Sequence, residues 1–179
     1  MILLWSSFLL ILPAVFGGVI HLYVVKKNWF SFLKIPIHLW AFGSNKTIRG
    51  FVVMPLATLF GSYVTILLEQ QLEVKNQIGL NNHWIIFGLG LGFFYTLFEL
   101  PNSFIKRRFN IPPGKTADKK KWTFLALDYS DSTIGMAMFY GIFVGTNFRV
   151  LIMGMFLSIF IHLFVNITLF KLGIRKERL

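Results

Sequence analysis

Three acidic residues of this chain stand beside long apolar stretches, where carboxylates are rare. Glu99, Asp128 and Asp131 lie at or near the ends of apolar runs, although the chain has only seven acidic residues in total. An unpaired carboxylate close to a membrane interior is costly, so each of these residues needs a partner. Neighbouring lysines and arginines are one kind of partner, and a bound cation is the other. Carboxylates without a histidine or cysteine cluster favour a hard cation, so we expect the three to bind Mg²⁺.

The spacing of two of these acids is typical of a shared site. Asp128 and Asp131 are three residues apart in "LDYSDSTIG", at the start of an apolar run. If a helix begins there, both carboxylates lie on one face and one metal ion can bridge them. The alternative is that Asp128, Ser130 or Asp131 caps the N-terminus of that helix.

The segment "ELPNSFIKRR" predicts a second polar face. Glu99, Ser103 and Lys106 follow the i, i+4, i+7 spacing of one helical stripe, and Pro101 marks either a kink or a new helix start. A carboxylate, a hydroxyl and an ammonium group would then face one site. The alternative for the three consecutive cations at 106–108 is an anchor that contacts anionic lipid at the end of a membrane helix.

A third polar segment, "FGSNKTIRGF", has features of a phosphate site. Lys46 and Arg49 flank Thr47 and Gly50 just before an apolar run, where backbone amides at a helix start and two cations would suit a phosphate. The spacing of a Walker A loop is absent. The segment "PPGK" at 112–115 reads as a rigid turn.

The rest of the chain predicts an all-α integral membrane protein. Of its 179 residues, 55% are hydrophobic and only 14% are charged, and cysteine is absent. This composition does not fit an ordinary soluble domain. We expect about five transmembrane helices, two cytoplasmic catalytic loops and a single domain over 1–179. The expected helices are the apolar runs at 1–25, 51–68, 84–98, 133–148 and 150–170.

The basic residues predict the orientation of the helices. The chain has a formal net charge of +11, and its cations concentrate in the connections 26–50 and 99–132 and in the C-terminal tail. Five helices with the N-terminus outside would place all three segments in the cytoplasm, in accord with the positive-inside rule. We therefore expect a plasma-membrane protein whose partners include membrane lipids and no nucleic acid, and which can form a homo-oligomer. The cations used here are Lys26, Lys27, Lys34, Lys46, Arg49, Lys106, Arg107, Arg108, Lys115, Lys119, Lys120, Lys121, Lys171, Arg175, Lys176 and Arg178, against Lys75 and Arg149 in the other connections.

The polar segments together resemble a known enzyme family. "NKTIRGF", "SFIKRR", "PPG" and "LDYSDS" follow one another in the order and approximate spacing of the CDP-archaeol synthases, from about residue 36 to 135. These enzymes are CTP:2,3-di-O-geranylgeranyl-sn-glycero-1-phosphate cytidylyltransferases. The chain is more distantly similar to the CDP-diacylglycerol synthases. The combination of "KTIRG" with "SFIKRR" is the specific part of the resemblance.

The resemblance implies a Mg²⁺-dependent transfer of CMP from CTP to an archaetidic or phosphatidic acid, giving a CDP-lipid and pyrophosphate. It implies phosphate contacts in two motifs, a hydrogen-bonding role for Ser103 at the catalytic centre, and metal ligation by the acids. The implied phosphate-binding residues are Lys46, Thr47, Arg49, Lys106 and Arg107, of which the last two are also implied to be catalytic with Ser103, and the implied metal ligands are Asp128, Asp131 and Glu99.

The chain also departs from the family pattern. Phe98-Glu99 stands where Gly-Asp is usual, and "DYSD" replaces the usual Asp-Gln-x-Asp. Two other functions are open: a small transporter or channel in which the three acids form an ion pathway, and a structural protein that binds anionic lipids through its basic loops. A transport pathway needs polar residues near the membrane midplane, whereas an enzyme at the membrane surface gathers them at one end.

Overall fold

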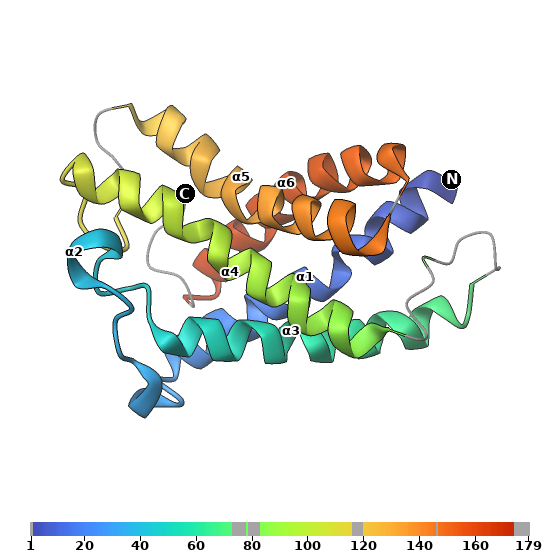
Figure 1. Cartoon of the computed structure of the whole chain (residues 1–179), viewed down its shortest axis with the longest axis horizontal. Helices are drawn as coiled ribbons and strands as arrows, with labels where there is room; N and C mark the ends of the chain where they lie inside the picture. The colour runs from blue at the N-terminus through green and yellow to red at the C-terminus, as the bar shows by residue number, and fades with distance from the viewer. Residues whose placement is uncertain (1, 73–77, 79–82, 116–119, 146, 174–179) are drawn as a thin grey trace.

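Helices account for nearly all of the regular structure in this computed structural model. The structure describes residues 2–72, 78, 83–115, 120–145 and 147–173, which contain no β-sheet. The cations Lys75, Lys119, Arg175, Lys176 and Arg178, which entered the prediction of orientation, lie outside the described residues. The long helices are α1 (Ile2–Lys26), α3 (Ile48–Glu69), α4 (Trp84–Arg108), α5 (Lys121–Phe139) and α6 (Phe148–Lys171), as Figure 1 shows.

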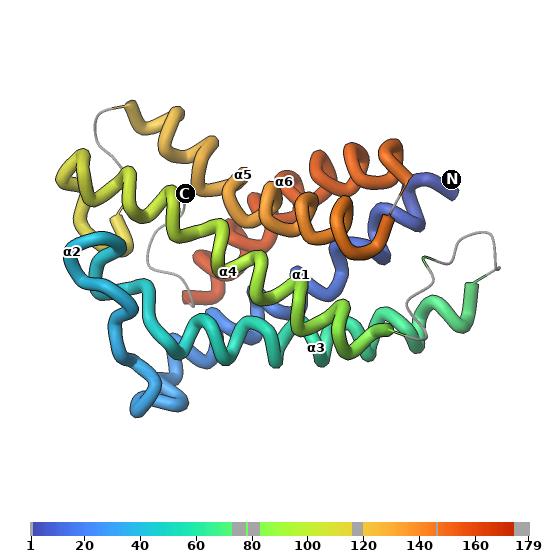
Figure 2. The backbone as a smooth tube through the Cα atoms, viewed as in Figure 1, coloured from blue at the N-terminus to red at the C-terminus, as the bar shows by residue number. Residues whose placement is uncertain are grey.

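Short elements complete the chain trace. A single 3₁₀ turn (Ser31–Leu33) and the short helix α2 (Leu39–Phe42) lie in the connection between α1 and α3. A π-helical segment, Tyr140–Val144, continues α5 up to Gly145, which ends it in a left-handed conformation. The tube in Figure 2 follows α1, α3, α4, α5 and α6 along a common long direction.

The expected membrane protein is confirmed, and the number of spans is close to the prediction. Within the described residues, α1, α3, α4 and α6 are long and apolar enough to cross a membrane. The fifth expected span is α5, which runs beside them but carries Asp128 and Asp131 in its middle. These polar residues make α5 less apolar than the other four long helices.

Two of the predicted boundaries are wrong for the same reason. The third run was expected to end at residue 98, but α4 continues to Arg108 through Pro101. The fourth was expected to begin at residue 133, but α5 begins at Lys121. Polar side chains interrupt the apolar sequence in both places without interrupting the helix. The residues expected in catalytic loops after these runs therefore lie on helices.

Close packing of α3 against α4 depends on small side chains. A Cβ atom at Gly92 of α4 would lie 2.2 Å from Thr58 Oγ1 of α3, so only glycine fits this approach. The Thr58 hydroxyl donates to the carbonyl of Gly88 at 2.7 Å, which links the two helices by a buried hydrogen bond. Small residues and interhelical hydroxyl bonds are a common means of helix association in membranes.

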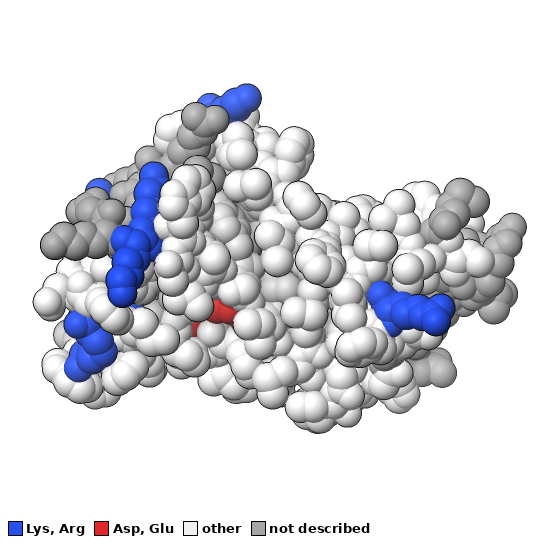
Figure 3. Space-filling model, turned by 90° about the horizontal axis from the view of Figure 1, so that it is seen from above, with Lys and Arg blue, Asp and Glu red and all other residues white. Residues whose placement is uncertain are grey.

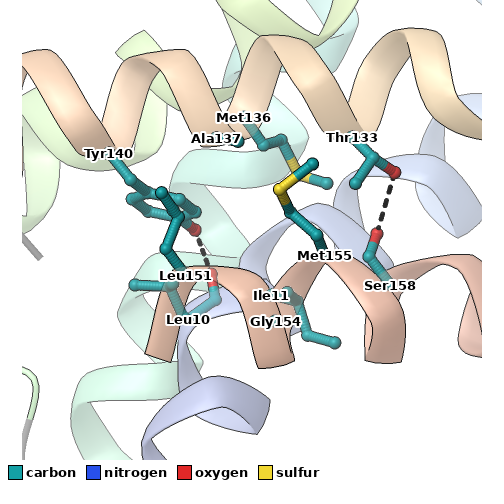
Figure 4. A pocket seen from close by; sticks show the side chains of 10 residues that line it. All are labelled: Leu10, Ile11, Thr133, Met136, Ala137, Tyr140, Leu151, Gly154, Met155 and Ser158. Atoms are coloured by element: carbon teal, nitrogen blue, oxygen red, sulfur yellow. Dashed lines mark hydrogen bonds between the residues drawn. The ribbon is translucent and has the colours of Figure 1, made fainter. Parts of the chain in front are cut away.

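A second contact layer joins α5 to α6 and α1. The Tyr140 hydroxyl donates to the Leu10 carbonyl, and the hydroxyls of Thr133 and Ser158 lie 3.3 Å apart (Figure 4). The small space between these residues is lined mainly by apolar side chains, including Met136. These contacts hold α1, α5 and α6 together. A cavity opens toward the other end of the bundle.

The charged helix ends gather at one end of the bundle. Helices α1, α4 and α6 end there, at Lys26, Arg108 and Lys171, and α5 begins there at Lys121. Along the chain, α1, α3, α4, α5 and α6 alternate in direction (Figure 1). The space-filling view shows most of its visible lysine and arginine atoms toward the α2 end, with a smaller group at the other end (Figure 3). The bundle is therefore strongly asymmetric in charge along its long axis.

Candidate active site

One large cavity opens at the cationic end of the bundle. It has a volume of 870 Å³ and is lined by residues of α1, α3, α4, α5, α6 and the connections beside them. Its size falls within the range of ~300–1,000 Å³ typical of small-molecule sites. All nine residues predicted from the sequence as functional line it, namely Lys46, Thr47, Arg49, Glu99, Ser103, Lys106, Arg107, Asp128 and Asp131.

The connection before α3 places the first motif at the cavity. The backbone N–H of Ile37 donates to the carbonyl of Lys46 at 2.9 Å, and the N–H of Ile48 donates to the carbonyl of Ile35 at 2.9 Å. These bonds fold residues 35–48 back on themselves and fix the position of Lys46. Thr47 is buried at the N-terminus of α3, and its side chain makes no capping hydrogen bond there.

Arg49 lies in the first turn of α3 and is only 5% exposed. Its Nη1 atom donates to Asn28 Oδ1 at 3.3 Å and to the carbonyl of Trp29 at 3.2 Å. Its Nε atom is buried and has no hydrogen-bond partner in the described chain. Arg49 therefore ties the end of α1 to the start of α3 and still has a donor to offer inside the cavity.

The predicted polar stripe of α4 is confirmed as a continuous helical face. Glu99, Ser103 and Lys106 lie on one helix that passes through Pro101 without breaking, and all three line the cavity. Glu99 forms an ion pair with Lys46 across the gap between α4 and the start of α3. The segment "ELPNSFIKRR" therefore faces the segment "FGSNKTIRGF".

A compact network joins α4 to the two aspartates of α5. Lys106 Nζ donates to Asp128 Oδ2 at 2.6 Å. The Asn102 amide Nδ2 donates to Asp128 Oδ1 at 2.8 Å and to Asp131 Oδ2 at 2.7 Å. The backbone N–H of Ser132 donates to Asp131 Oδ1 at 2.6 Å. One amide nitrogen thus lies between two carboxylates that share a face of α5.

The capping role considered for Asp128, Ser130 and Asp131 is excluded. Helix α5 begins at Lys121, so these residues lie in its interior, with Lys120 at the N-cap position in a left-handed conformation. The helix does not begin at Asp128, but both acids lie on it with the three-residue spacing that was predicted to place them on one face. Their carboxylates serve the interface with α4 and not the helix terminus.

The three consecutive cations at the end of α4 have different environments. Lys106 and Arg107 line the cavity, whereas the Arg108 guanidinium lies 3.6 Å from the ring centroid of Trp40 and Nη2 donates to the Trp40 carbonyl at 2.8 Å. A simple lipid anchor does not explain this arrangement, because two of the three point to a common interior site. Arg108 instead fastens α4 to α2.

Arg107 is held against the connection between the helices with donors to spare. Its Nε and Nη1 atoms are buried and have no hydrogen-bond partner in the part of the chain that the structure describes. A Cβ atom at Gly43 would lie 2.9 Å from Pro113 Cγ and 3.5 Å from Arg107 Nη1, and Gly43 has a φ of +84°. Glycine is therefore required at position 43, and the guanidinium is placed where an anion can meet it.

Sequence reasoning missed several residues of the site. Asn102 has no charge to mark it, and Tyr129, whose buried hydroxyl has no partner among the described residues, looks like an ordinary membrane aromatic. The "PPGK" segment is a turn, as predicted, with the N–H of Lys115 donating to the Pro112 carbonyl at 3.2 Å, but it also lines the cavity. The only sequence signal that this turn belongs to the site was its position a few residues after the cations at 106–108.

The inner part of the cavity is mainly apolar. Ile11, Ala14, Met54 and Met136 line it from α1, α3 and α5. The charged residues named above lie nearer the cationic helix ends. The cavity therefore combines a polar rim with an apolar interior, an arrangement that suits a ligand with a charged head and an apolar tail.

Only part of the expected metal site is assembled. Asp128 and Asp131 are brought together, but within the described residues no group of three or more histidine, cysteine, aspartate or glutamate side chains is placed to hold a metal ion. Glu99, the expected third ligand, is engaged with Lys46. The two carboxylates supply oxygen donors of the kind that a hard cation prefers, and the Asn102 amide nitrogen lies between them.

Comparison with known proteins identifies the family. A family model described as CarS-like, CDP-archaeol synthase, matches residues 3–178, nearly the whole chain. No curated protein and no solved structure matches the chain. The family's name denotes an enzyme that forms CDP-archaeol, which implies CTP-dependent cytidylyl transfer to a lipid. Since its motif residues also meet in one cavity, the chain belongs to the CDP-archaeol synthase family.

Proposed function

We propose that this protein transfers CMP from CTP to the phosphate of a membrane lipid, an archaetidic or phosphatidic acid, in a Mg²⁺-dependent reaction. An oxygen of the lipid phosphate attacks the α-phosphorus of CTP and forms a new phosphoanhydride bond. The bond between the α- and β-phosphates breaks, and pyrophosphate leaves. The observation that carries this proposal is the joint placement of cations and carboxylates from all the family motifs at one end of a single cavity.

The cationic side of the cavity supports a triphosphate site. Arg49 and Arg107 both have buried donor atoms without a hydrogen-bond partner among the described residues, and Lys46 and Lys106 lie within the same lining. Charge-assisted hydrogen bonds to phosphate are stronger than neutral ones and fix its orientation. Phosphoryl and nucleotidyl transfer depend mainly on such positioning and charge neutralisation, so no covalent nucleophile is required.

The remaining roles at the reaction centre follow from placement and chemistry. Ser103 is buried on the same stripe as Lys106 and acts as a hydrogen-bond donor to a phosphate oxygen. Asp128 and Asp131 would hold Mg²⁺. Glu99 lines the same cavity and forms an ion pair with Lys46. When bound, Mg²⁺ neutralises phosphate charge and favours departure of pyrophosphate.

The acceptor lipid enters with its phosphate at the polar rim and its chains along the apolar interior. The chains contact α1 and the inner part of the cavity, where Gly18 leaves open space. The cationic rim faces the cytoplasm, where CTP is available, and this places the N-terminus outside the plasma membrane. Either ether-linked or ester-linked chains satisfy these generic apolar contacts.

A transport function has less support. A transport pathway requires polar residues through the membrane midplane. Here the inner cavity is lined by Ile11, Met54 and Met136, and the buried Thr58 hydroxyl beyond it bonds to backbone carbonyls. The described polar lining therefore gathers at one end, as expected for catalysis at a membrane surface.

The test is a direct assay for the product. Purified protein in detergent is incubated with α-labelled CTP, Mg²⁺ and, in separate reactions, ether-linked and ester-linked phosphatidic lipids. We expect a labelled CDP-lipid and an equal amount of pyrophosphate with at least one lipid. A folded protein that forms neither product with either lipid would contradict the proposal. The Asp128→Asn variant controls for contaminating cytidylyltransferases.

A further inference from the structure

Asn102 occupies a position that its neutral side chain does not explain. It is 6% exposed, and its Nδ2 atom lies 2.8 Å from Asp128 Oδ1 and 2.7 Å from Asp131 Oδ2. Two carboxylates that converge on one donor form a favourable site for positive charge, yet the group between them is uncharged. Lys106 Nζ contacts both oxygens of Asp128, at 2.5 Å from Oδ1 and 2.6 Å from Oδ2, but the group that contacts both acids is the Asn102 amide.

The other end of the same amide is in the opposite situation. Asn102 Oδ1 is buried and has no hydrogen-bond partner among the described residues. A buried carbonyl oxygen without a donor is costly, so native proteins rarely keep one without a reason. Nitrogen and oxygen of an asparagine amide have nearly the same size, and a half-turn about the terminal torsion exchanges their positions with little change in shape.

We propose that Asn102 is a two-state ligand of the metal site and completes it in place of Glu99. Without an ion, the amide N–H₂ group holds Asp128 and Asp131 together. When a divalent cation binds, the amide turns and presents Oδ1 as a neutral oxygen ligand beside the two carboxylates. This inference depends on the proposed function in one respect, which is that the ion is Mg²⁺.

The environment of Glu99 supports this assignment. Glu99 is paired with Lys46, and within the described residues it does not form a three-carboxylate metal group with Asp128 and Asp131. Asn102 has no competing ion pair, and its carbonyl oxygen is already desolvated. A hard divalent cation accepts carboxylate and amide oxygens together, as in many protein sites.

The experiment measures Mn²⁺ binding to the full chain in detergent, with free Mn²⁺ followed by electron paramagnetic resonance. Mn²⁺ accepts the same oxygen ligands as Mg²⁺. Asn102→Leu removes both the donor and the ligand, and we expect it to weaken binding roughly 10–100-fold. Asn102→Asp cannot donate but can coordinate, and we expect it to bind at least as tightly as the wild type. Asn45→Asp, which adds the same charge at an exposed position of the cavity lining, should leave the affinity unchanged.

Thermal unfolding supplies a second readout. Without metal, Asn102→Asp places a third carboxylate against Asp128 and Asp131, so its melting temperature should fall below that of the wild type. Saturating Mn²⁺ should restore it, with a larger shift than the wild type shows, because an ion that binds only the folded state stabilises it. If Asn102→Leu does not fold, the comparison of Asn102→Asp with the wild type still decides.

The contrary outcomes are distinct. If Asn102→Asp binds Mn²⁺ as weakly as Asn102→Leu, the amide acts only as a donor and the proposed coordination is wrong. Wild-type affinity in Asn102→Leu, or in Asp128→Asn, would also overturn it, since the ion would then bind elsewhere. Mn²⁺ binding with the expected pattern but no CDP-lipid in the assay would reject the proposed function and leave the metal site intact.

Discussion

The two ends of the bundle each contain acidic side chains, but they use them in different ways. Glu69 is completely buried in the last turn of α3, where it accepts a hydrogen bond from the backbone N–H of Ile78. Asp128 and Asp131 line a large cavity and share Asn102 as a partner, and Asp128 also pairs with Lys106. Burial alone therefore does not mark a functional acid, whereas a shared partner beside open volume does.

The physical difference is how easily each partner can be exchanged. An acid at a helix C-terminus faces the negative end of the helix dipole, so Glu69 requires the support of the connecting segment. The Ile78 N–H that Glu69 accepts from is a backbone group, which cannot rotate away as a side chain can. The partners of Asp128 and Asp131 are side chains, which can rotate toward a ligand. The first arrangement stabilises the structure, and the second is suited to binding.

The largest expected effect is loss of activity at the aspartates. Asp128→Asn and Asp131→Asn each remove a charge that we assign to the metal site, and we expect CDP-lipid formation to fall at least about 100-fold. Because both variants also change the bonds to Asn102 and Lys106, thermal melts must show that each variant is folded at the assay temperature. Initial rates at saturating CTP and Mg²⁺ provide the measurement. Normal Mg²⁺-dependent rates in both variants would refute the metal assignment.

A smaller effect is expected at Lys106. Lys106→Met keeps the length of the side chain but removes its charge, and it should raise the apparent KM for CTP roughly tenfold or more with less change in the KM for lipid. Steady-state kinetics with each substrate varied in turn separate the two. Arg108→Met is the matched control, because Arg108 points to Trp40 and not into the cavity. Equal effects of the two variants on CTP use would remove Lys106 from the phosphate site.

Two glycines extend the comparison from charge to volume. A Cβ at Gly18 meets nothing within 4 Å, whereas one at Gly92 meets Thr58 Oγ1 at 2.2 Å. Gly18→Leu should leave stability unchanged and raise the apparent KM for lipid several-fold, since it fills the apolar lining. Gly92→Ala should cost about 1–3 kcal/mol through overpacking. Thermal melts and lipid titrations test both, and a Gly18→Leu protein with normal lipid use would show that the chains bind elsewhere.

At the Glu69 end of the bundle, we expect a substitution to lower stability and to leave activity unchanged. Glu69→Leu removes a buried acceptor and leaves its backbone donor without that partner, so we expect a loss of about 1–3 kcal/mol. CTP and lipid kinetics of the folded fraction should be those of the wild type. Chemical denaturation in detergent gives the first quantity and the product assay the second. Loss of activity without loss of stability would contradict the structural role of Glu69.

The smallest expected effect is at the hydroxyl pair of α5 and α6. Thr133→Val removes one side of the 3.3 Å contact with Ser158, and interhelical hydroxyl bonds in membranes contribute about 0.6 kcal/mol on average. We expect a shift of that order and unchanged kinetics. A change in CTP or lipid kinetics would show that this layer is coupled to the cavity. Ser158→Ala tests the same bond from its other end.

The sequence predicted the type of fold and the members of the site better than their setting. Apolar runs identified α1, α3 and α6 closely, because the lysine, arginine and glutamate residues of those helices lie only near their ends. They failed for α4 and α5, where Asn102, Ser103 and Lys106 on one helix and Asp128 and Asp131 on the other face the cavity. A hydropathy pattern reads such a polar face as the end of a membrane helix.

The partners within the site could not be predicted in the same way. The pairing of Lys46 with Glu99 joins residues 53 positions apart, and no local pattern encodes it. Asn102 was overlooked because an amide is common in loops and the residue lies between a proline and a serine in the sequence. Its meaning depends on two carboxylates from another helix. Three-dimensional packing supplies that information.

The ion pairs at the cavity make ligand capture an exchange reaction. Lys46 is paired with Glu99 and Lys106 with Asp128, so much of the cationic lining is already neutralised by neighbours. An incoming anion and its counter-cation can divide these pairs between them, the anion taking the lysines and the cation taking an acid. The number of bare charges in the cavity then changes little during turnover. Affinity for such a combined ligand should depend less on ionic strength than affinity for the anion alone.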